Sequence, residues 1–358
     1  MNRPLLSVIV PTYGRWQHIG PLLDSILAQD FDDWECVVAE DGSPNQEQVR
    51  AEVAARAERA NGRIRFEPNP KTLGYDANFR RLIELARGRF VFVMGDDDFV
   101  APGAFRAVAG AIERYPNIGM VLRAFAWFRD TPDNVIQISR YYPRETFFPA
   151  GPKAIVACYR RAVVMSGLVL DRDLAQSFAT DRWDGTVFYQ QWLVANILVT
   201  KDAVYLPQLL AYFRRGGTPI FGTAEKEKGL YTPGVQPPDT DLRMNQSLLS
   251  IARAVEQERG VPIAAAIERD FAHYIYHTLA HQAHVPRREF KEFYKALGKQ
   301  GLNKYPSYHA WYWAIRIFGA DNLDRLFQLV RRVLGHTPNL SAFTRGGRRG
   351  HLASRTET

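Results

Sequence analysis

The N-terminal half of the chain alternates short apolar runs with amphipathic segments, and this alternation limits its possible folds more than any other feature. Apolar runs at 5–13, 34–42 and 89–98 end in polar turns, and helical spacing fills 16–29, 45–60 and 78–87. Strand–helix–strand units of this length form parallel sheets with helices on both faces. We therefore expect an α/β fold with a Rossmann-like, mixed but mostly parallel sheet flanked by helices.

The pattern changes twice further along the chain. Residues 100–212 remain mixed: we expect a helix over 102–114, strands near 118–128 and 163–170, a helix over 186–199 and a late edge strand over 203–213. Gly, Pro and Thr dominate 214–239, and five helical patterns then follow at 243–259, 262–283, 287–299, 306–318 and 321–335. The expected division is an α/β domain over 1–215, a flexible loop over 216–242, a basic helical region over 243–335 and a disordered basic tail over 336–358.

Composition is that of a globular protein. The chain is 46% hydrophobic and 23% charged, and it contains no run of eighteen apolar residues that would indicate a transmembrane helix. The early run LLSVIV is short and is followed by Pro11, so we interpret it as a buried strand and not as a signal peptide. Cys36 and Cys158 lie in apolar surroundings, which predicts reduced, buried thiols and a cytoplasmic protein.

Charge is distributed unevenly. Residues 241–358 hold 18 Lys and Arg against 10 Asp and Glu, whereas residues 1–240 hold 28 of each sign. A basic C-terminal part attracts phosphate-rich partners, which include nucleic acid, anionic lipid and a lipid-pyrophosphate acceptor.

The sequence GDDD at 95–98 is the strongest candidate for chemistry. Asp96, Asp97 and Asp98 directly follow the apolar run FVFVM, where a buried strand emerges from the sheet. Three carboxylates at such a place repel one another unless a cation lies between them. Mn²⁺ or Mg²⁺ takes oxygen ligands, can bridge a diphosphate and stabilises a leaving group that develops negative charge.

Three motifs in order now carry a resemblance: SVIVPTYGR, VVAEDGS and LGYDANFRRLIELARGRFVFVMGDDDFVAPGA. Together they resemble family 2 glycosyltransferases of the GT-A fold, closely over about 5–105 and more loosely to 215. Within that family, the GDDDF and SGLVLDRD segments are similar to abequosyltransferase-like enzymes of O-antigen synthesis.

The resemblance implies roles for matching residues. Pro11, Thr12 and Tyr13 would line the nucleobase and ribose pocket, Asp41 would accept a hydrogen bond from the base, and Asn78 would support the nucleotide site. Asp96 and Asp98 would hold the ribose and the metal, and the role of Asp97 lies open between these two tasks. The sequence departs from the family pattern at Gly14, where Asn is usual, and at Gly95, where an aspartate is usual, so the assignment within the triplet stays open.

The catalytic base and the acceptor site are less well marked. Inverting members of the family use a carboxylate to deprotonate the acceptor hydroxyl. Asp184 is our first candidate and Asp181 the second, while Gln190-Gln191 stands where the usual acidic pair would be. Ser166-Gly167 is a candidate for shaping the acceptor site. Arg214 or Arg215, beside a Gly-rich loop, is expected to pair with the donor phosphates.

Two C-terminal patterns allow alternatives. The aromatic stretch 305–318, flanked by Lys299 and Lys304, fits either an interfacial membrane helix or a helix packed on the α/β domain. His273, His277 and His281 follow helical spacing, which fits a metal-binding face less well than an ordinary amphipathic helix.

These observations predict a metal-dependent inverting glycosyltransferase that uses a nucleoside-diphosphate sugar donor. The expected acceptor is a glycan or a polyprenyl-linked glycan in bacterial surface-polysaccharide synthesis, with peripheral contact to an anionic membrane at the inner face of the plasma membrane. The alternative is a nucleic-acid-binding protein that uses the basic C-terminal region, but carboxylates at a strand end repel phosphate, so we expect no nucleic acid partner. A nucleotidyltransferase would need a Gly-rich phosphate loop after the first strand, which PTYGRW does not supply.

Overall fold

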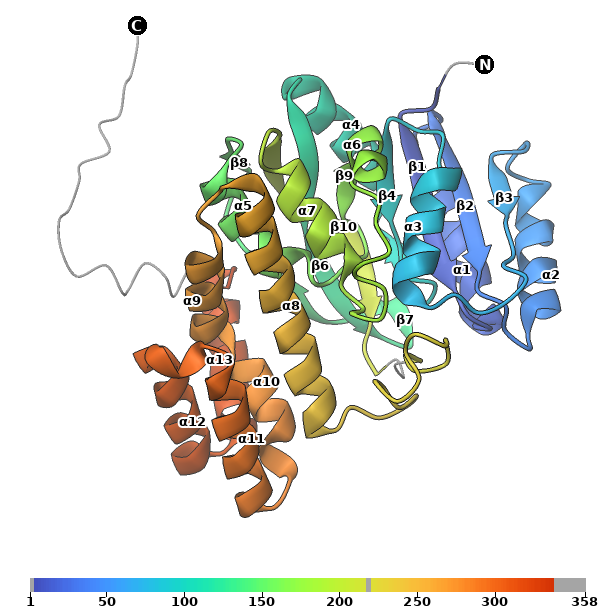
Figure 1. Ribbon diagram of the computed structural model, residues 1–358. Helices are drawn as coiled ribbons and strands as arrows, with labels where there is room; N and C mark the ends of the chain where they lie inside the picture. The colour runs from blue at the N-terminus through green and yellow to red at the C-terminus, as the bar shows by residue number, and fades with distance from the viewer. Residues whose placement is uncertain (1–2, 217–219, 338–358) are drawn as a thin grey trace, which may run out of the picture.

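One sheet organises the N-terminal two thirds of the protein (Figure 1). A computed structural model describes residues 3–216 and 220–337. Eight strands of the sheet follow the order β3-β2-β1-β4-β9-β6-β10-β5, while β7 pairs with β6 and β8 pairs with β10. The strands are β1 Leu6–Thr12, β2 Trp34–Glu40, β3 Ile64–Phe66, β4 Phe90–Val93, β5 Phe99–Val100, β6 Ile118–Arg129, β7 Thr131–Ser139, β8 Thr146–Phe148, β9 Val169–Asp171 and β10 Asp202–Arg214.

Strand pairing is parallel in the first half of the sheet and mixed in the second. β1 pairs in parallel with β2 and β4, β2 pairs in parallel with β3, and β6 pairs in parallel with β10. The short β9 joins the two halves because it lies antiparallel to both β4 and β6. The predicted mixed sheet is therefore confirmed, with parallel pairs dominating its first half.

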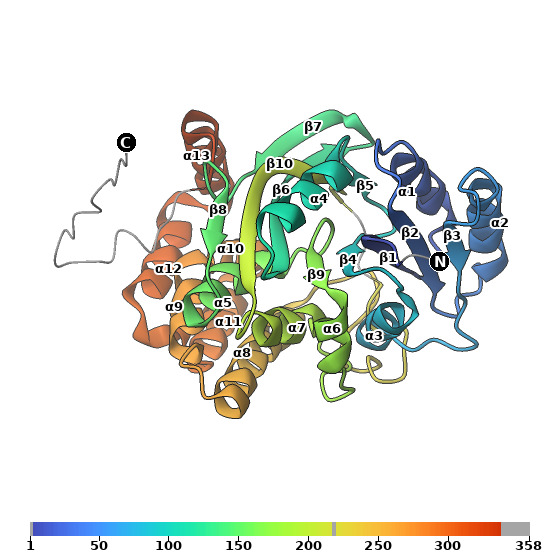
Figure 2. The ribbon, with the colours of Figure 1, turned by 90° about the horizontal axis from the view of Figure 1, so that it is seen from above.

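Helices cover both faces of the sheet (Figure 2). Apolar residues of α1, α2 and α4 pack on one face, and those of α3, α5, α6 and α7 pack on the other. The buried face of each helix follows the spacing of its apolar residues. In α1, for example, the buried residues include Ile19, Leu22, Leu23 and Ile26. The bounds are α1 Trp16–Leu27, α2 Gln46–Ala57, α3 Tyr75–Leu85, α4 Ala104–Arg114, α5 Pro152–Tyr159, α6 Arg172–Ser177 and α7 Tyr189–Ile197, with a 3₁₀ turn η1 at Arg160–Ala162.

Two strand predictions in the middle of the chain are wrong. β10 is not an edge strand, because it pairs with β6 along one side and with β5 and β8 along the other. The predicted strand over 163–170 reduces to the start of β9, since Gly167 takes a positive φ of 76° and turns the chain just before it. Residues 163–168 pack in the two cores of the sheet, and only Gly167 and Leu168 form backbone hydrogen bonds with Val93 of β4.

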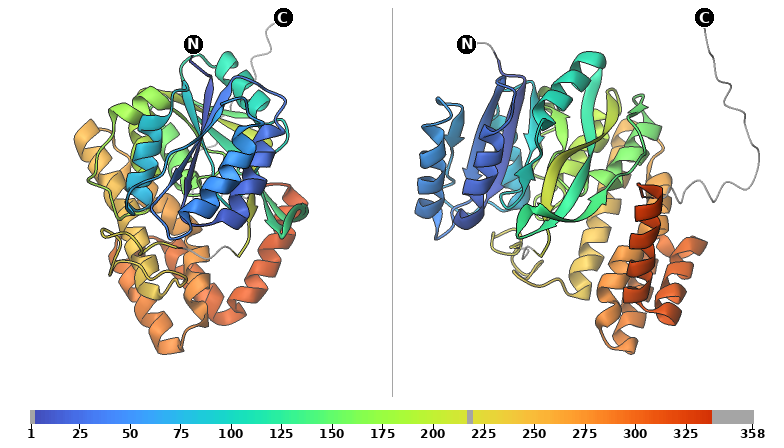
Figure 3. Two further views of the ribbon diagram at one scale, coloured as in Figure 1. Left: turned by 90° about the vertical axis from the view of Figure 1, so that its right-hand side faces the viewer. Right: turned by 180° about the vertical axis from the view of Figure 1, so that it is seen from behind.

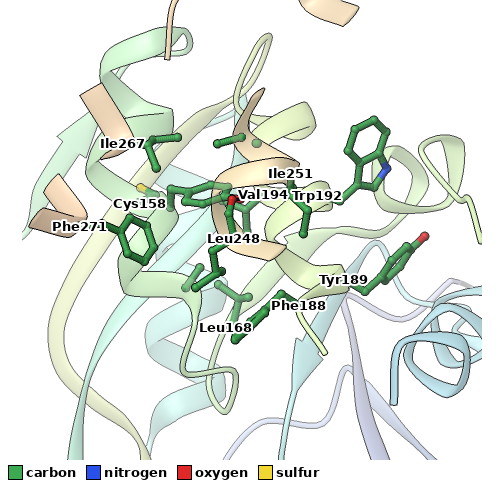
Figure 4. Packing of buried hydrophobic residues seen from close by; sticks show 14 of the residues in the cluster. Cys158, Leu168, Phe188, Tyr189, Trp192, Val194, Leu248, Ile251, Ile267 and Phe271 are labelled. Atoms are coloured by element: carbon green, nitrogen blue, oxygen red, sulfur yellow. Dashed lines mark hydrogen bonds between the residues drawn. The ribbon is translucent and has the colours of Figure 1, made fainter. Parts of the chain in front are cut away.

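The C-terminal region is helical, as predicted, and forms no separate core. Leu248, Ile251 and Phe271 of its helices pack on Cys158 and Trp192 of the α/β domain (Figure 4). Cys158 and Cys36 are both buried and unbonded to each other. The elements are α8 Pro238–Arg259, α9 Ala264–Tyr274, α10 Tyr276–His281, η2 Gln282–His284, α11 Arg287–Lys299, η3 Leu302–Lys304, α12 Pro306–Phe318 and α13 Ala320–Leu334.

Several predicted boundaries shift in this region. The helix expected over 262–283 is divided into α9, α10 and η2, and α8 begins at Pro238, so the loop predicted over 216–242 ends five residues early. Proline at the first helical position explains that start, because it needs no hydrogen bond there. Most of the tail predicted over 336–358 lies outside the described residues. Across the described part of the chain, no helix combines the length and apolar character needed to cross a bilayer.

Candidate active site

A pocket of about 430 Å³ lies at the carboxyl ends of β1, β2 and β4, where ligands bind in open α/β sheets. It is lined by every residue that the sequence predicted to bind the sugar nucleotide, with the exception of Arg214. These are Pro11, Thr12, Tyr13, Asp41, Asn78, Asp96, Asp97 and Asp98. Residues separated by more than eighty positions therefore meet because parallel neighbouring strands end at the same edge.

Asp96 is held by groups from the end of β1. The Thr12 hydroxyl donates to Asp96 Oδ2 at 2.7 Å, and Arg15 Nη1 lies 3.2 Å from Asp96 Oδ1. The same Arg15 nitrogen lies 2.7 Å from Asp97 Oδ2. Burial raises the pKa of Asp96 to about 6, against the opposing effect of Arg15. Arg15 was not predicted as a site residue, although its place directly after PTYG at the same sheet edge is the signal that could have identified it.

Asp98 is turned towards the protein. Its Oδ2 accepts a hydrogen bond from the Ser166 hydroxyl at 2.5 Å, and its Oδ1 accepts one from the Arg214 backbone N–H at 2.9 Å. Burial, followed by the charge of Asp97, raises the pKa of Asp98 to about 8. Ser166 thus supports the triplet, which differs from its expected role in shaping the acceptor site.

Gly95 has a physical explanation in this arrangement. Its N–H donates to the Ser166 hydroxyl at 2.7 Å, so Ser166 occupies the space beside the triplet. A Cβ at position 95 would lie 3.1 Å from Asp98 Oδ2 and 3.2 Å from Ser166 Oγ. The family's usual aspartate at this position would therefore compete with Ser166 for the same space.

Asp41 fixes the loop that leads into α3. It accepts hydrogen bonds from the backbone N–H groups of Leu73 at 2.8 Å and Gly74 at 2.9 Å, and from the Asn69 side chain at 2.7 Å. Burial raises its pKa to about 6. Asn78 accepts a hydrogen bond from Asn69 at 2.9 Å and donates one to the Ala39 carbonyl at 3.0 Å. It therefore links the loop before α3 to β2.

Arg214 does not face this pocket. Its side chain donates to the backbone carbonyls of Asp97 at 3.2 Å and Asp130 at 3.1 Å, and its guanidinium lies over the Phe128 ring. The predicted contact between Arg214 and donor phosphate is therefore not available in this conformation. Arg215 points to a different cavity, described below.

The two predicted catalytic bases do not line the pocket. Asp184 is buried in an ion pair with Arg80 and also lies 2.9 Å from Lys226 Nζ, and Asp181 is exposed. Of the polar pair at the expected position, Gln190 reaches the pocket, where its Oε1 accepts a bond from the Tyr75 hydroxyl at 3.1 Å. An amide cannot act as a general base at neutral pH, so Gln190 does not take the role that the resemblance assigns to an acidic pair at this position.

The segment 220–237 covers one side of the pocket and supplies further lining residues. Glu227 binds the N–H groups of Tyr75 and Gly222, each at 2.8 Å, and this fixes the segment against the start of α3. Its sequence offered no signal beyond Gly and Pro content, which is why the contribution was missed. The residues facing the pocket are Ile220, Phe221, Thr223, Glu227 and Gln236.

The carboxylates of the triplet suit a divalent cation, but they do not form a complete metal site by themselves. Among residues 3–216 and 220–337, no group of three or more His, Cys, Asp or Glu side chains is arranged to hold a metal ion. This also covers His273, His277 and His281. Within the triplet, Asp97 Oδ1 accepts no hydrogen bond from the described residues, and Mg²⁺ commonly binds one or two carboxylates together with substrate phosphates.

A second cavity, of about 600 Å³, lies between the sheet and the C-terminal helices. It shares four wall residues with the first pocket, so the two spaces adjoin. These are Val163, Phe188, Gln236 and Met244. Residues of β6 and β7 line one side of the second cavity, and residues of α8, α9, α10 and α13 line the other.

The aromatic stretch 305–318 forms α12, which packs mainly on α9, α10 and α13 of the C-terminal region and not on the α/β domain. Tyr308, Tyr312 and Ile315 of α12 are buried, whereas Trp313, Ile317 and Phe318 are exposed. The following helix α13 continues this apolar surface with Leu326, Leu329, Val333 and Leu334, all exposed.

The fold and the strand-end pocket define a GT-A-type α/β protein. Among solved structures, S. aureus TarS 1–349 in complex with UDP-GlcNAc superposes with a TM-score of 0.58 at 15% identity, covering 93% of this chain and 92% of that one. The mannosyltransferase PcManGT from Pyrobaculum calidifontis, in complex with GDP-Man and Mn²⁺, gives a TM-score of 0.51 at 17% identity, covering 94% and 88%.

Sequence comparison finds a similar family for the first part of the chain. Residues 7–168 match the model of Glycosyl transferase family 2. An uncharacterized protein of Mycobacterium tuberculosis is 34% identical over 140 residues, which are 39% of this chain and 41% of that protein. The GalNAc(5)-diNAcBac-PP-undecaprenol beta-1,3-glucosyltransferase of Campylobacter jejuni is 33% identical over 102 residues, 28% and 32% of the two chains. The chain thus spans less than half the length of these relatives. Residues 7–168 are therefore similar to glycosyl transferase family 2.

Proposed function

We propose that the protein is an inverting glycosyltransferase that moves a sugar from a nucleoside-diphosphate sugar to a glycan or lipid-linked acceptor in bacterial surface-polysaccharide synthesis. The observation that carries this proposal is the pocket at the ends of β1, β2 and β4, with Asp41 on one side and the aspartate triplet on the other. Its volume suits a ligand of nucleotide size. The donor complexes of the two structural neighbours support it.

Each part of the pocket has a chemical task in this reaction. Thr12, Tyr13 and Asp41 would bind the nucleoside, with Asp41 fixed by the N–H groups of Leu73 and Gly74. The acceptor hydroxyl would attack the anomeric carbon as the bond to the nucleoside diphosphate breaks, and its proton would pass to a base. Two buried carboxylates replace Asp184 as candidates for that role. Glu227 lines this pocket, and Asp241 lines the adjoining cavity.

Mn²⁺ or Mg²⁺ would be held by the triplet together with the donor diphosphate. Asp96 and Asp98 are the carboxyls implied by the family resemblance, and Asp97 joins them because its Oδ1 has no hydrogen bond within the described residues. The cation would neutralise the charge that develops on the leaving diphosphate. Mn²⁺ in the complex of the Pyrobaculum neighbour supports this choice of metal.

The exposed apolar surface of α12 and α13 supports peripheral contact with the inner face of an anionic membrane. Arg316, Arg325 and Arg332 are exposed among its apolar residues, a combination that suits the boundary between headgroups and acyl chains. The undecaprenol-linked acceptor in the name of the Campylobacter relative supports a lipid-linked substrate.

Nucleotide-dependent thermal stabilisation tests the proposed function. UDP, GDP, CDP and dTDP are added to the protein with Mn²⁺ or with EDTA. One of the four is expected to raise the melting temperature by several degrees with Mn²⁺ and little with EDTA. If none stabilises the protein while a DNA duplex does, the nucleic-acid-binding alternative replaces the enzyme.

A further inference from the structure

We propose that the second cavity is the acceptor site, and that it binds the sugar-diphosphate end of a prenyl-linked acceptor. This inference rests on the proposed function. The first reason is adjacency: Val163, Phe188, Gln236 and Met244 line both spaces, so the second cavity begins where the donor pocket ends. An acceptor hydroxyl must reach the anomeric carbon from such an adjoining space.

The cavity carries charged groups of both signs. Arg160, Arg215 and Arg331 line it, together with Asp241 and Asp324. Arg160 is neutralised, since it binds Asp270 at 2.7 Å outside the cavity lining. Within the described residues, neither Arg215 nor Arg331 forms an ion pair with a carboxylate. Two guanidinium groups without carboxylate partners suit a diphosphate, whose oxygens accept paired N–H donors.

Arg331 is held in place by a neutral partner. Its Nη2 donates to His277 Nε2 at 3.2 Å. Burial, followed by the charge of Arg331, lowers the pKa of His277 to about 4, so the imidazole stays uncharged near neutral pH. His277 therefore orients the guanidinium without cancelling its charge. Asp324 is engaged by the Tyr276 hydroxyl at 2.9 Å.

The opposite wall suits a sugar ring. Phe125, Trp127 and Tyr141 come from β6 and from the chain that follows β7, and they form a contiguous aromatic group. Flat aromatic surfaces beside a few polar side chains are typical of sites that orient small ligands. The polar side chains of Gln137, Ser139 and Asn245 also line this cavity.

Helix α13 connects the cavity to the proposed membrane surface. Asp324, Phe327 and Arg331 on one side of α13 line the cavity, whereas Leu329 and Val333 on the other side are 59% and 77% exposed. Figure 3 shows α13 at the surface of the helical region, beside the sheet. Because a helix with its side chains is only about 10 Å thick, a prenyl chain on the outer side can present its diphosphate to Arg331.

Binding of farnesyl diphosphate to the full-length protein tests this proposal. The titration is done by calorimetry in EDTA, where the carboxylates of the donor pocket repel a diphosphate. We expect Arg331→Gln and Arg215→Gln each to weaken binding about tenfold, as the loss of a charge-assisted contact predicts. Arg288→Gln, which removes an exposed charge on α11 outside the cavity lining, should leave affinity unchanged. Farnesol and inorganic pyrophosphate should both bind more weakly than farnesyl diphosphate.

The outcomes separate this inference from the proposed function. The cavity assignment is wrong if Arg331→Gln and Arg215→Gln both bind farnesyl diphosphate as tightly as the wild type. Displacement of farnesyl diphosphate by a nucleotide with Mn²⁺ would also overturn it. Nucleotide stabilisation in Arg331→Gln equal to that of the wild type verifies that the variant is folded. If no nucleotide binds but farnesyl diphosphate binding still requires Arg331, the cavity is an anionic lipid site and the transferase function fails instead.

Discussion

The donor pocket and the second cavity adjoin but have opposite chemistry. The donor pocket gathers four buried or partly buried aspartates at the ends of parallel strands, whereas the second cavity presents arginines and aromatic rings between the sheet and the C-terminal helices. A carboxylate site needs a cation before it can accept a diphosphate, but an arginine site does not. Under the two proposals, donor binding should therefore depend on metal and acceptor binding should not.

The largest effect should come from Asp97→Asn, which changes the donor side alone. Asp97 Oδ1 is the triplet oxygen without a hydrogen bond in the described part of the chain, so the amide should remove a metal ligand and leave the packing intact. We expect turnover to fall about 10³-fold and the Mn²⁺-dependent stabilisation by nucleotide to disappear. Steady-state kinetics and thermal shift measure both.

Asp133→Asn is the matched control, because Asp133 is exposed on β7 away from both cavities. Farnesyl diphosphate binding should be the same in Asp97→Asn and wild type. A variant that lost this binding too would show that the two cavities are not chemically independent.

Asp184→Asn should change neither cavity directly, so it tests whether Asp184 has a structural or a catalytic role. Asp184 is buried and binds Arg80, so removal of its charge leaves that guanidinium without its partner. We expect a loss of about 3 kcal/mol in the free energy of unfolding, with turnover of the folded enzyme within threefold of wild type. Chemical denaturation and kinetics below the melting temperature provide the two values. A loss of turnover above a hundredfold, with stability unchanged, would restore Asp184 as the catalytic base.

The smallest effect concerns Asp76, which holds the start of α7 beside both cavities. Its carboxylate accepts hydrogen bonds from Val187 N–H at 2.8 Å and Tyr189 N–H at 2.9 Å, and burial raises its pKa to about 7. Since this pKa lies above the ordinary value of 3.8, the group's contribution to stability is complete below about pH 4 and is lost as the pH rises towards 7.

Asp76→Asn removes this titration. Between pH 5 and pH 7 the unfolding free energy of the wild type should fall relative to that of the variant, by at most about 1.4 kcal/mol per pH unit, and the difference should be constant above pH 8. Urea denaturation at several pH values measures it. Parallel pH profiles for the two proteins would mean that Asp76 is ionised throughout this range.

The same contrast explains what could be predicted from the sequence. The donor pocket is built from strand ends, and each of its aspartates directly follows an apolar run, so local pattern and family resemblance together identified Asp41 and the triplet. The supporting contacts were less accessible: Ser166 bonds Asp98 only because β9 lies antiparallel to β4 and brings residue 166 to the same edge.

The second cavity was not predictable by these means. Trp127 lies on β6 and Arg331 on α13, and no local spacing relates residues two hundred positions apart. The position of the candidate base Asp184 was unpredictable for a related reason: the turn before α7 directs its side chain to Arg80 and away from the pocket.

Hydrogen–deuterium exchange of the full-length protein with Mn²⁺ and each of the four nucleoside diphosphates tests the central claim most directly. One nucleotide is expected to slow exchange around 11–15, 41–43, 73–78 and 95–98, the segments that form the donor pocket, and to leave 271–278 and 324–331 unchanged. Protection confined to the C-terminal helices, or no protection with any nucleotide, would contradict the assignment of the aspartate pocket as the donor site.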